Sequence, residues 1–150
     1  MNTEEQIEPQ FATAIADYIR RFNMLENNIG YSVRWMKRSD GNGGGAIEST
    51  FHGKLSQFKE LISQRSLEPF FAEWFTTVDC CRALRNNIVH GHWEVLPHLD
   101  KPIRFDTQRP GQSEAQREQG DFTLQEFLKQ LSGIVEASDT FSKLRQSHGI

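Results

Sequence analysis

The sequence predicts an all-α fold: an up-and-down bundle of about four helices, with a small extended or hairpin insertion before the last helix. Apolar residues recur every three or four positions over long stretches, which is typical of helices that bury one face. Capping residues stand before several of these stretches, and prolines interrupt the pattern ahead of the last one. The 150 residues fit one domain, residues 1–150, that is large enough to bury a core.

The first predicted helix is the longest. From Ile7 to Met36 the apolar residues keep helical spacing without a gap. Pro9 suits its first turn, and Gly30 marks a place where the helix can kink or stop. Four glycines within residues 41–45 then predict a connecting loop. The sequence leaves open whether this loop is only a connector or also a lid.

Two further helices follow this loop. Residues 49–50 offer a serine or threonine cap for a second helix that ends near Arg65. A third begins within residues 66–69 and runs to His90. Because the turn between them is short, we expect the two helices to pack side by side and antiparallel. Gly91 is placed to adopt the left-handed conformation that ends many helices.

The segment before the last helix is expected to be irregular. Residues 93–96 and 103–105 are predicted to be short extended pieces that form a small hairpin, and residues 106–121 a polar loop. Residues 123–126 (TLQE) have the spacing of a capping box, in which the first and fourth side chains cap each other's backbone. They therefore predict the start of the last helix.

Charge and cysteine content limit the class of protein. The net charge of −3, from 17 basic and 20 acidic residues, weighs against nonspecific coating of nucleic acid, which requires many neutralised phosphates. No stretch approaches the roughly 18 apolar residues of a membrane helix, and no signal-peptide pattern opens the chain. A disulfide between the adjacent Cys80 and Cys81 would be strained, and reduced thiols fit a reducing compartment. We therefore expect a cytoplasmic protein with no membrane partner.

The third predicted helix breaks the amphipathic pattern. On a helical wheel its apolar residues span roughly 180°, wider than the stripe of about 100° that one bundle face needs. These residues are Phe70, Phe71, Trp74, Phe75, Val78, Cys81, Leu84, Ile88 and Val89. A second copy of the chain is the simplest cover for the surplus, so the pattern predicts a homodimer formed through this helix.

Polar residues interrupt the same helix near its end. Arg82 and Arg85 lie within the apolar arc, where a guanidinium must reach solvent, pair with a carboxylate such as Asp79, or hold a ligand anion. Asn86 and His90 are four residues apart and are therefore neighbours on one flank of the helix. The spacing gathers arginine, amide and imidazole groups at one helix end.

The segment 85–90 (RNNIVH) resembles the R-x(4–6)-H motif of HEPN domains, in which a polar residue commonly follows the arginine. Its continuation, residues 91–93 (GHW), is similar to small bacterial HEPN-like proteins that end this helix in H-G-x-W. The resemblance covers the third helix by motif and the rest of the chain by helical order alone. It implies a HEPN-like bundle that acts as a dimer and cleaves RNA without metal or cofactor. It also implies a defence or toxin–antitoxin setting, with a cognate antitoxin or another protein as partner.

In such a site the RNA 2′-hydroxyl attacks the phosphate and leaves a 2′,3′-cyclic phosphate. His90 would act as general acid or base, because imidazole titrates near neutral pH. Arg85 would stabilise the charge that develops on the phosphate, and Asn86 would orient the imidazole or the phosphate. The residues expected to contact substrate nearby are Arg82, His92 and Trp93. An ideal helix points Arg85 and His90 roughly 140° apart, so closing the site needs a bent side chain, a loosened last turn or a second subunit.

Other interpretations fit the same residues. His90 can cap the last helix carbonyls, the arginines can bridge helices, and Trp93 can plug the end of the bundle. A noncatalytic, dimeric HEPN-like module that binds a protein partner or a nucleotide is the leading alternative to a nuclease.

A metal site and an RNA-binding helix face were also weighed. His90 and His92, with His98 and Asp100 nearby, lack a diagnostic metal-ligand spacing, so no metal is expected. The best local supply of cations for RNA is on the first helix, where the same residues can equally form a solvated face. These are Arg20, Arg21, Arg34, Lys37 and Arg38.

Overall fold

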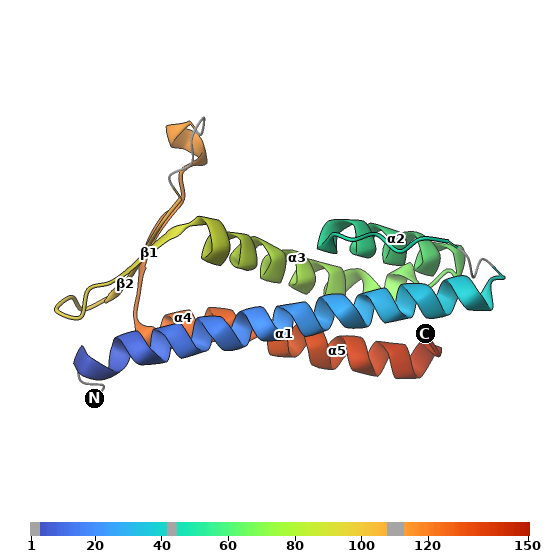
Figure 1. Ribbon diagram of the computed structural model, residues 1–150, viewed down its shortest axis with the longest axis horizontal. Helices are drawn as coiled ribbons and strands as arrows, with labels where there is room; N and C mark the ends of the chain where they lie inside the picture. The colour runs from blue at the N-terminus through green and yellow to red at the C-terminus, as the bar shows by residue number, and fades with distance from the viewer. Residues whose placement is uncertain (1–3, 42–44, 108–112) are drawn as a thin grey trace. The chain divides into compact units, whose positions relative to one another are not determined.

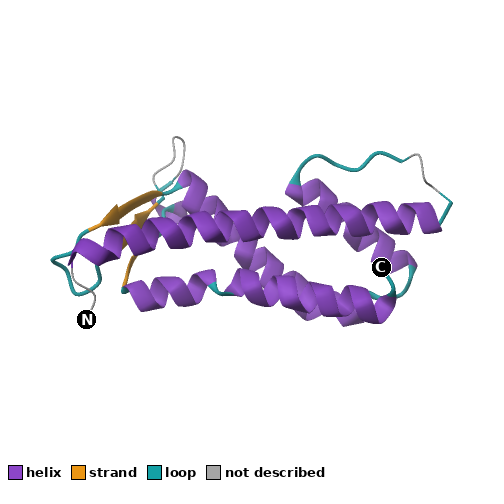
Figure 2. Ribbon diagram, turned by 60° about the horizontal axis from the view of Figure 1, so that its bottom comes forward, coloured by secondary structure: helices purple, strands orange, loops and turns teal. Residues whose placement is uncertain are grey.

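The computed structural model describes residues 4–41, 45–107 and 113–150. The chain is mostly helical (72%), and its described part contains five α-helices and one three-stranded antiparallel sheet (Figure 2). The elements are α1 (Glu4–Ser39), α2 (Phe51–Gln64), α3 (Glu68–His90), β1 (His92–Val95), β2 (Ile103–Asp106), the 3-10 helix η1 (Glu114–Gln116), β3 (Gln119–Phe122), α4 (Leu124–Leu131) and α5 (Gly133–His148). The predicted helical class is confirmed, and the predicted hairpin insertion is a small sheet.

Helix α1 runs through Gly30, so the helix does not stop at this glycine. Ile29 and Val33 on either side are fully buried, and this burial outweighs a glycine cost of about 1 kcal/mol. Pro9 is also not in the first turn, because α1 begins at Glu4. Most of the predicted glycine loop, residues 42–44, lies outside the described residues.

Helices α2 and α3 form where the sequence predicts them. The Thr50 hydroxyl accepts a hydrogen bond from the Gly53 amide at 3.0 Å and so caps α2. Ser66, with φ of 56°, turns the chain toward α3. Phe58 of α2 packs against Phe71 of α3 with ring centroids 5.3 Å apart. The expected side-by-side packing of these two helices is therefore confirmed.

Gly91 follows α3 without a left-handed backbone conformation, so that expectation is wrong. The glycine is needed for space instead. A β-carbon at this position would lie 2.3 Å from a ring carbon of Phe105 and 2.4 Å from the Asn87 carbonyl oxygen. The absence of a side chain lets the sheet approach the end of the helix.

The sheet has the order β1-β2-β3 and follows α3 directly (Figure 1). Strands β1 and β2 pair antiparallel with Trp93 opposite Phe105, close to the predicted extended pieces. Gly120 of β3 lies opposite Phe105 from the other side. The predicted polar loop, residues 106–121, is therefore wrong at Asp106, which ends β2, and at residues 119–121, which belong to β3. It is also wrong at residues 114–116, which form η1, and residues 108–112 lie outside the described residues.

The predicted capping box opens α4, with Thr123 and Glu126 each bonded to the other's backbone amide. The expected single last helix is instead two helices. The break lies at Ser132, whose hydroxyl donates to the Lys129 carbonyl at 2.6 Å. A serine that bonds to nearby backbone competes with the helical hydrogen bonds, and the helical run resumes as α5 at Gly133.

The packing divides the chain into two compact units. The first is Met1–Arg20 with Asp79–Ile134, and the second is Arg21–Val78 with Val135–Ile150. The aromatic core of the first unit consists of Phe11, Trp93, Phe105 and Phe127. That of the second consists of Phe58, Phe71, Trp74 and Phe141. Within the described residues, no helix combines the length and the apolar character that a membrane crossing requires. The single domain remains a prediction.

Candidate site at the C-terminal end of helix α3

All predicted site residues belong to the first unit. The segment 85–90 occupies the last turns of α3, which ends at His90 as predicted. His92 and Trp93 follow on β1. The fold thus gathers the predicted residues around one helix end and the strand that leaves it.

The Arg85 side chain folds toward its neighbour Asn86. It is half-buried, with its Nε atom inaccessible to solvent, and Nη1 donates to the Asn86 carbonyl oxygen Oδ1 at 3.4 Å. The amide therefore holds one end of the guanidinium on the flank that leads to His90.

His90 lies one turn after Asn86 and is exposed. Residues four apart on a helix bring their β-carbons to roughly 5–6 Å, so Asn86 and His90 are neighbours on the surface of α3. Val89 beside it is 48% exposed. Solvent, and any ligand or partner, can therefore reach the imidazole.

The helix end is fixed to the sheet by the Asn87 carbonyl. This oxygen accepts from the Gly91 amide at 2.8 Å and from the Trp93 indole at 3.0 Å. The Asn87 side chain donates to a carboxylate oxygen of Glu118 at 3.2 Å. These bonds place the last turn of α3 in one orientation against β1.

Trp93 packs into the aromatic core of the first unit. Its ring centroid is 4.5 Å from that of Phe105, 5.2 Å from Phe127 and 6.0 Å from Phe11. These contacts favour the interpretation of Trp93 as a plug at the end of the bundle. Its role in substrate binding stays a prediction.

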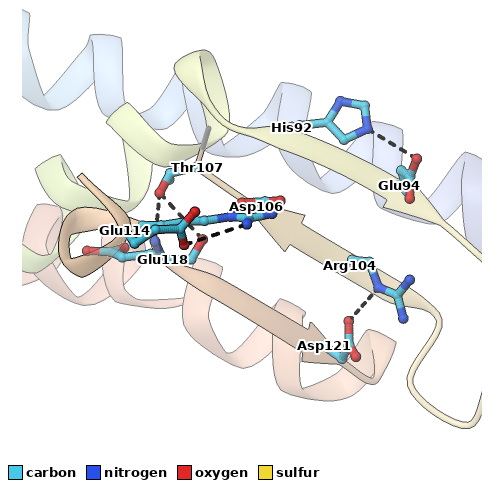
Figure 3. A network of polar contacts seen from close by, with 9 residues as sticks. His92, Glu94, Arg104, Asp106, Thr107, Glu114, Glu118 and Asp121 are labelled. Carbon is cyan, nitrogen blue, oxygen red and sulfur yellow. Dashed lines mark hydrogen bonds and ion pairs between the residues drawn. The ribbon is translucent and has the colours of Figure 1, made fainter. Parts of the chain in front are cut away.

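The His92 side chain lies on the face of β1 opposite that of Trp93, because successive side chains alternate along a strand. Its Nε2 lies 3.2 Å from an Oε1 of Glu94, and the two residues point toward each other in Figure 3. The His92 side chain is 70% exposed. The structure thus places it beside a carboxylate.

Arg82 lies one turn before the motif. Its guanidinium is 3.8 Å from the Asp79 carboxylate, the ion pair that the sequence suggested. Exposed pairs of this kind contribute little to stability, so the arginine can exchange this partner for a phosphate at small cost.

The sheet carries a polar network that the sequence did not predict (Figure 3). Arg117 donates through Nε and Nη2 to the two carboxylate oxygens of Asp106, and Arg104 donates to Asp121 at 3.0 Å. The hydrogen bond from Arg117 holds the pKa of the Asp106 carboxyl below its usual value. These residues line a cavity of about 540 Å³. Each guanidinium already has a carboxylate partner, so we interpret the network as structural.

The cysteines and the buried tyrosine add no further chemistry. Cys80 and Cys81 are free thiols, the first exposed and the second buried. The Tyr18 hydroxyl donates to the Cys81 carbonyl at 2.7 Å, and burial raises the pKa of Tyr18 well above its usual value. Within the described residues, no three histidine, cysteine or carboxylate side chains gather as a metal site would require.

Comparison with protein-family models, curated proteins and solved structures found no match to this chain.

Proposed function

We propose that this chain is a HEPN-like, metal-independent endoribonuclease that acts as a homodimer, with its active site at the C-terminal end of α3. One observation carries the proposal: Arg85 is bonded to Asn86, and Asn86 lies one turn before His90. An accessible imidazole can transfer the protons in RNA cleavage by the 2′-hydroxyl, and a fixed cation can stabilise the charge that develops on the phosphate.

In the proposed reaction the 2′-oxygen bonds to phosphorus while the bond from phosphorus to the 5′-oxygen breaks. One imidazole removes the 2′-hydroxyl proton, and a protonated imidazole supplies a proton to the departing 5′-oxygen. Arg85 donates to the phosphate oxygens as their charge increases. The products are a 2′,3′-cyclic phosphate and a 5′-hydroxyl.

A second copy of the chain supplies the second imidazole in this proposal. Val89, the residue before His90, is 48% exposed, so an apolar side chain lies uncovered next to the motif. A dimer formed on this side of α3 covers apolar surface and brings the two motifs together. It also removes the need for Arg85 and His90 of one chain to meet across roughly 140° of helix.

One observation favours the protein-binding form of the alternative, which is a noncatalytic module that binds a protein partner or a nucleotide. Two carboxylates lie beside the end of α3: Glu94, next to His92, and Glu118, next to Asn87. Negative charge beside a site disfavours the binding of a negatively charged phosphate. A protein partner would meet no such repulsion.

Purified protein incubated with total RNA in EDTA tests the proposal. Wild type should cleave, and His90→Ala should reduce the rate by about 10²- to 10⁴-fold through loss of general acid–base catalysis. His98→Ala is the matched control, because His98 is an exposed histidine outside the site, and it should cleave at the wild-type rate.

Absence of cleavage by the folded wild type would leave the binding module as the better account. Cleavage at equal rates by wild type and His90→Ala would exclude His90 as the catalyst. Cleavage that EDTA abolishes would contradict the metal-independent mechanism.

A further inference from the structure

A cleft in the second unit lies between the C-terminal half of α1 and α5. It has a volume of about 630 Å³ and is lined by Tyr31, Trp35, Ser142, Arg145, Gln146, Gly149 and Ile150. No aspartate or glutamate is among these lining residues. The cleft is therefore aromatic and cationic at once.

Its two aromatic rings are unusually open for their size. Tyr31 is 59% exposed and Trp35 is 58% exposed, and the four-residue spacing places them next to each other on α1. The Trp35 indole donates to the Gly149 carbonyl at 3.1 Å. This bond holds the ring at the edge of the cleft and leaves most of it uncovered.

Two exposed arginines lie close to these rings along α1. Arg34 and Arg38 are exposed and lie three residues after Tyr31 and Trp35 respectively, on the same helical stripe. Within the described residues, neither has a carboxylate partner. On the other wall, Arg145 donates through Nε to the main-chain oxygen of Ile150 at 3.4 Å, and its guanidinium lies 5.5 Å from the centre of the Phe141 ring.

The acidic groups of this half of α1 are already paired. Asp40 accepts from Arg65 at 2.8 and 3.0 Å, and Glu26 accepts from Lys54 at 2.8 Å. The positive charge of the stripe is therefore not neutralised by its own helix. A complementary ligand must bring negative charge as well as flat apolar surface.

We propose that this cleft binds single-stranded nucleic acid. Unpaired bases present the flat faces that stack on tyrosine and tryptophan, and the sugar–phosphate backbone that links the bases carries one phosphate per base. Arginines placed three residues from each ring suit that repeat. A duplex hides its base faces, and an apolar peptide would leave the cations without partners.

The proposal does not require that the end of α3 cleave RNA, because the cleft and the motif belong to different units. Binding here would be largely independent of sequence, since every base has a stacking face. It would make the chain a single-strand binder even if the α3 site proved inactive.

Fluorescence anisotropy with labelled oligouridylate and oligothymidylate of about 12 nucleotides tests this binding. Wild type should bind both, and bind a duplex of equal length far more weakly. Trp35→Ala should weaken binding about tenfold or more, and Trp35→Phe should restore most of it. If three arginines contact phosphates, a plot of the logarithm of the association constant against the logarithm of the salt concentration should have a slope of about −2.

Two controls separate this site from other causes. Leu128→Ala removes an exposed apolar side chain from α4, in the first unit, and should leave binding unchanged. His90→Ala should also bind like wild type, which distinguishes failure of this proposal from failure of the nuclease proposal. Binding of the RNA alone would narrow the ligand to RNA and support the site.

Several results would overturn the proposal. Wild type that fails to bind either oligonucleotide at low salt has no such site. Equal binding of duplex, or equal loss in Leu128→Ala, would contradict base stacking on Trp35. If Trp35→Ala instead converts a dimer into a monomer in sedimentation velocity, a second copy of the chain covers the cleft.

Discussion

At the residue scale, the candidate site consists of an arginine, an amide and an imidazole at the end of α3. The spacing of Arg85, Asn86 and His90 fixed their places on a helix end, and the ion pair of Arg82 with Asp79 followed from a three-residue separation. The bond between Arg85 and Asn86 joins adjacent residues. Whether an arginine folds back on its neighbour depends on side-chain rotamers that no spacing specifies.

The pair of Arg117 and Asp106 escaped prediction because both residues lie in the segment 106–121 that the sequence predicts as a loop, and spacing does not show which residues of a loop meet. In the folded protein the bond lowers the pKa of the Asp106 carboxyl. A carboxyl whose pKa is lower in the folded protein stabilises the fold at pH values above its unfolded pKa of about 3.8. This stabilisation is lost as the pH falls through the pKa of the folded protein.

Arg117→Gln should therefore lower the melting temperature more at about pH 7 than at about pH 2.5. Circular dichroism at the two pH values measures the difference. Lys129→Gln removes an exposed cation from α4 and should show no such dependence. An equal shift at both pH values would mean that the Asp106 carboxylate does not stabilise the fold through Arg117.

At the element scale, helix bounds followed from periodicity and caps, while breaks and strands did not. The box of Thr123 and Glu126 placed the start of α4 correctly. Strand β3 was missed because Gln119, Gly120 and Asp121 have low strand propensity. The strand forms because β2 offers a partner edge, and this pairing depends on tertiary structure.

Gly91 shows how an element junction can depend on space alone. Gly91→Ala should destabilise the fold by about 1–3 kcal/mol, because the new methyl group overlaps the Phe105 ring and the Asn87 carbonyl. Urea unfolding measures the loss. Gly133→Ala is the matched control, since its β-carbon would lie 3.7 Å from the nearest atom, the Cys81 sulfur. Equal effects of both substitutions would remove the steric explanation.

At the scale of the whole molecule, the apolar surplus of α3 was readable from the sequence. Val89, at 48% exposed, is part of that surplus. The division into two units was not readable, because α1 and α3 each contribute residues to both and no linker separates them. The spacing of apolar residues indicates that a helix has a buried face, and it does not indicate which of two cores that face packs into.

The proposed dimer can be tested at this scale. Val89→Asp should place a charge in the interface and convert a dimer into a monomer, with loss of RNA cleavage. Sedimentation velocity measures the change in mass. Val135→Asp makes the same substitution at an exposed valine of the second unit and should leave the dimer intact. A wild type that is monomeric at all concentrations would exclude the shared active site.

The chemical ends of the cleaved RNA test the central claim most directly. Mass spectrometry should find a 2′,3′-cyclic phosphate and a 5′-hydroxyl after incubation of a short RNA with wild type in EDTA. The corresponding DNA, which lacks the attacking 2′-hydroxyl, should stay intact, as should the RNA incubated with His90→Ala. Cleavage of the DNA, or the same RNA ends produced by His90→Ala, would contradict the account of the α3 site.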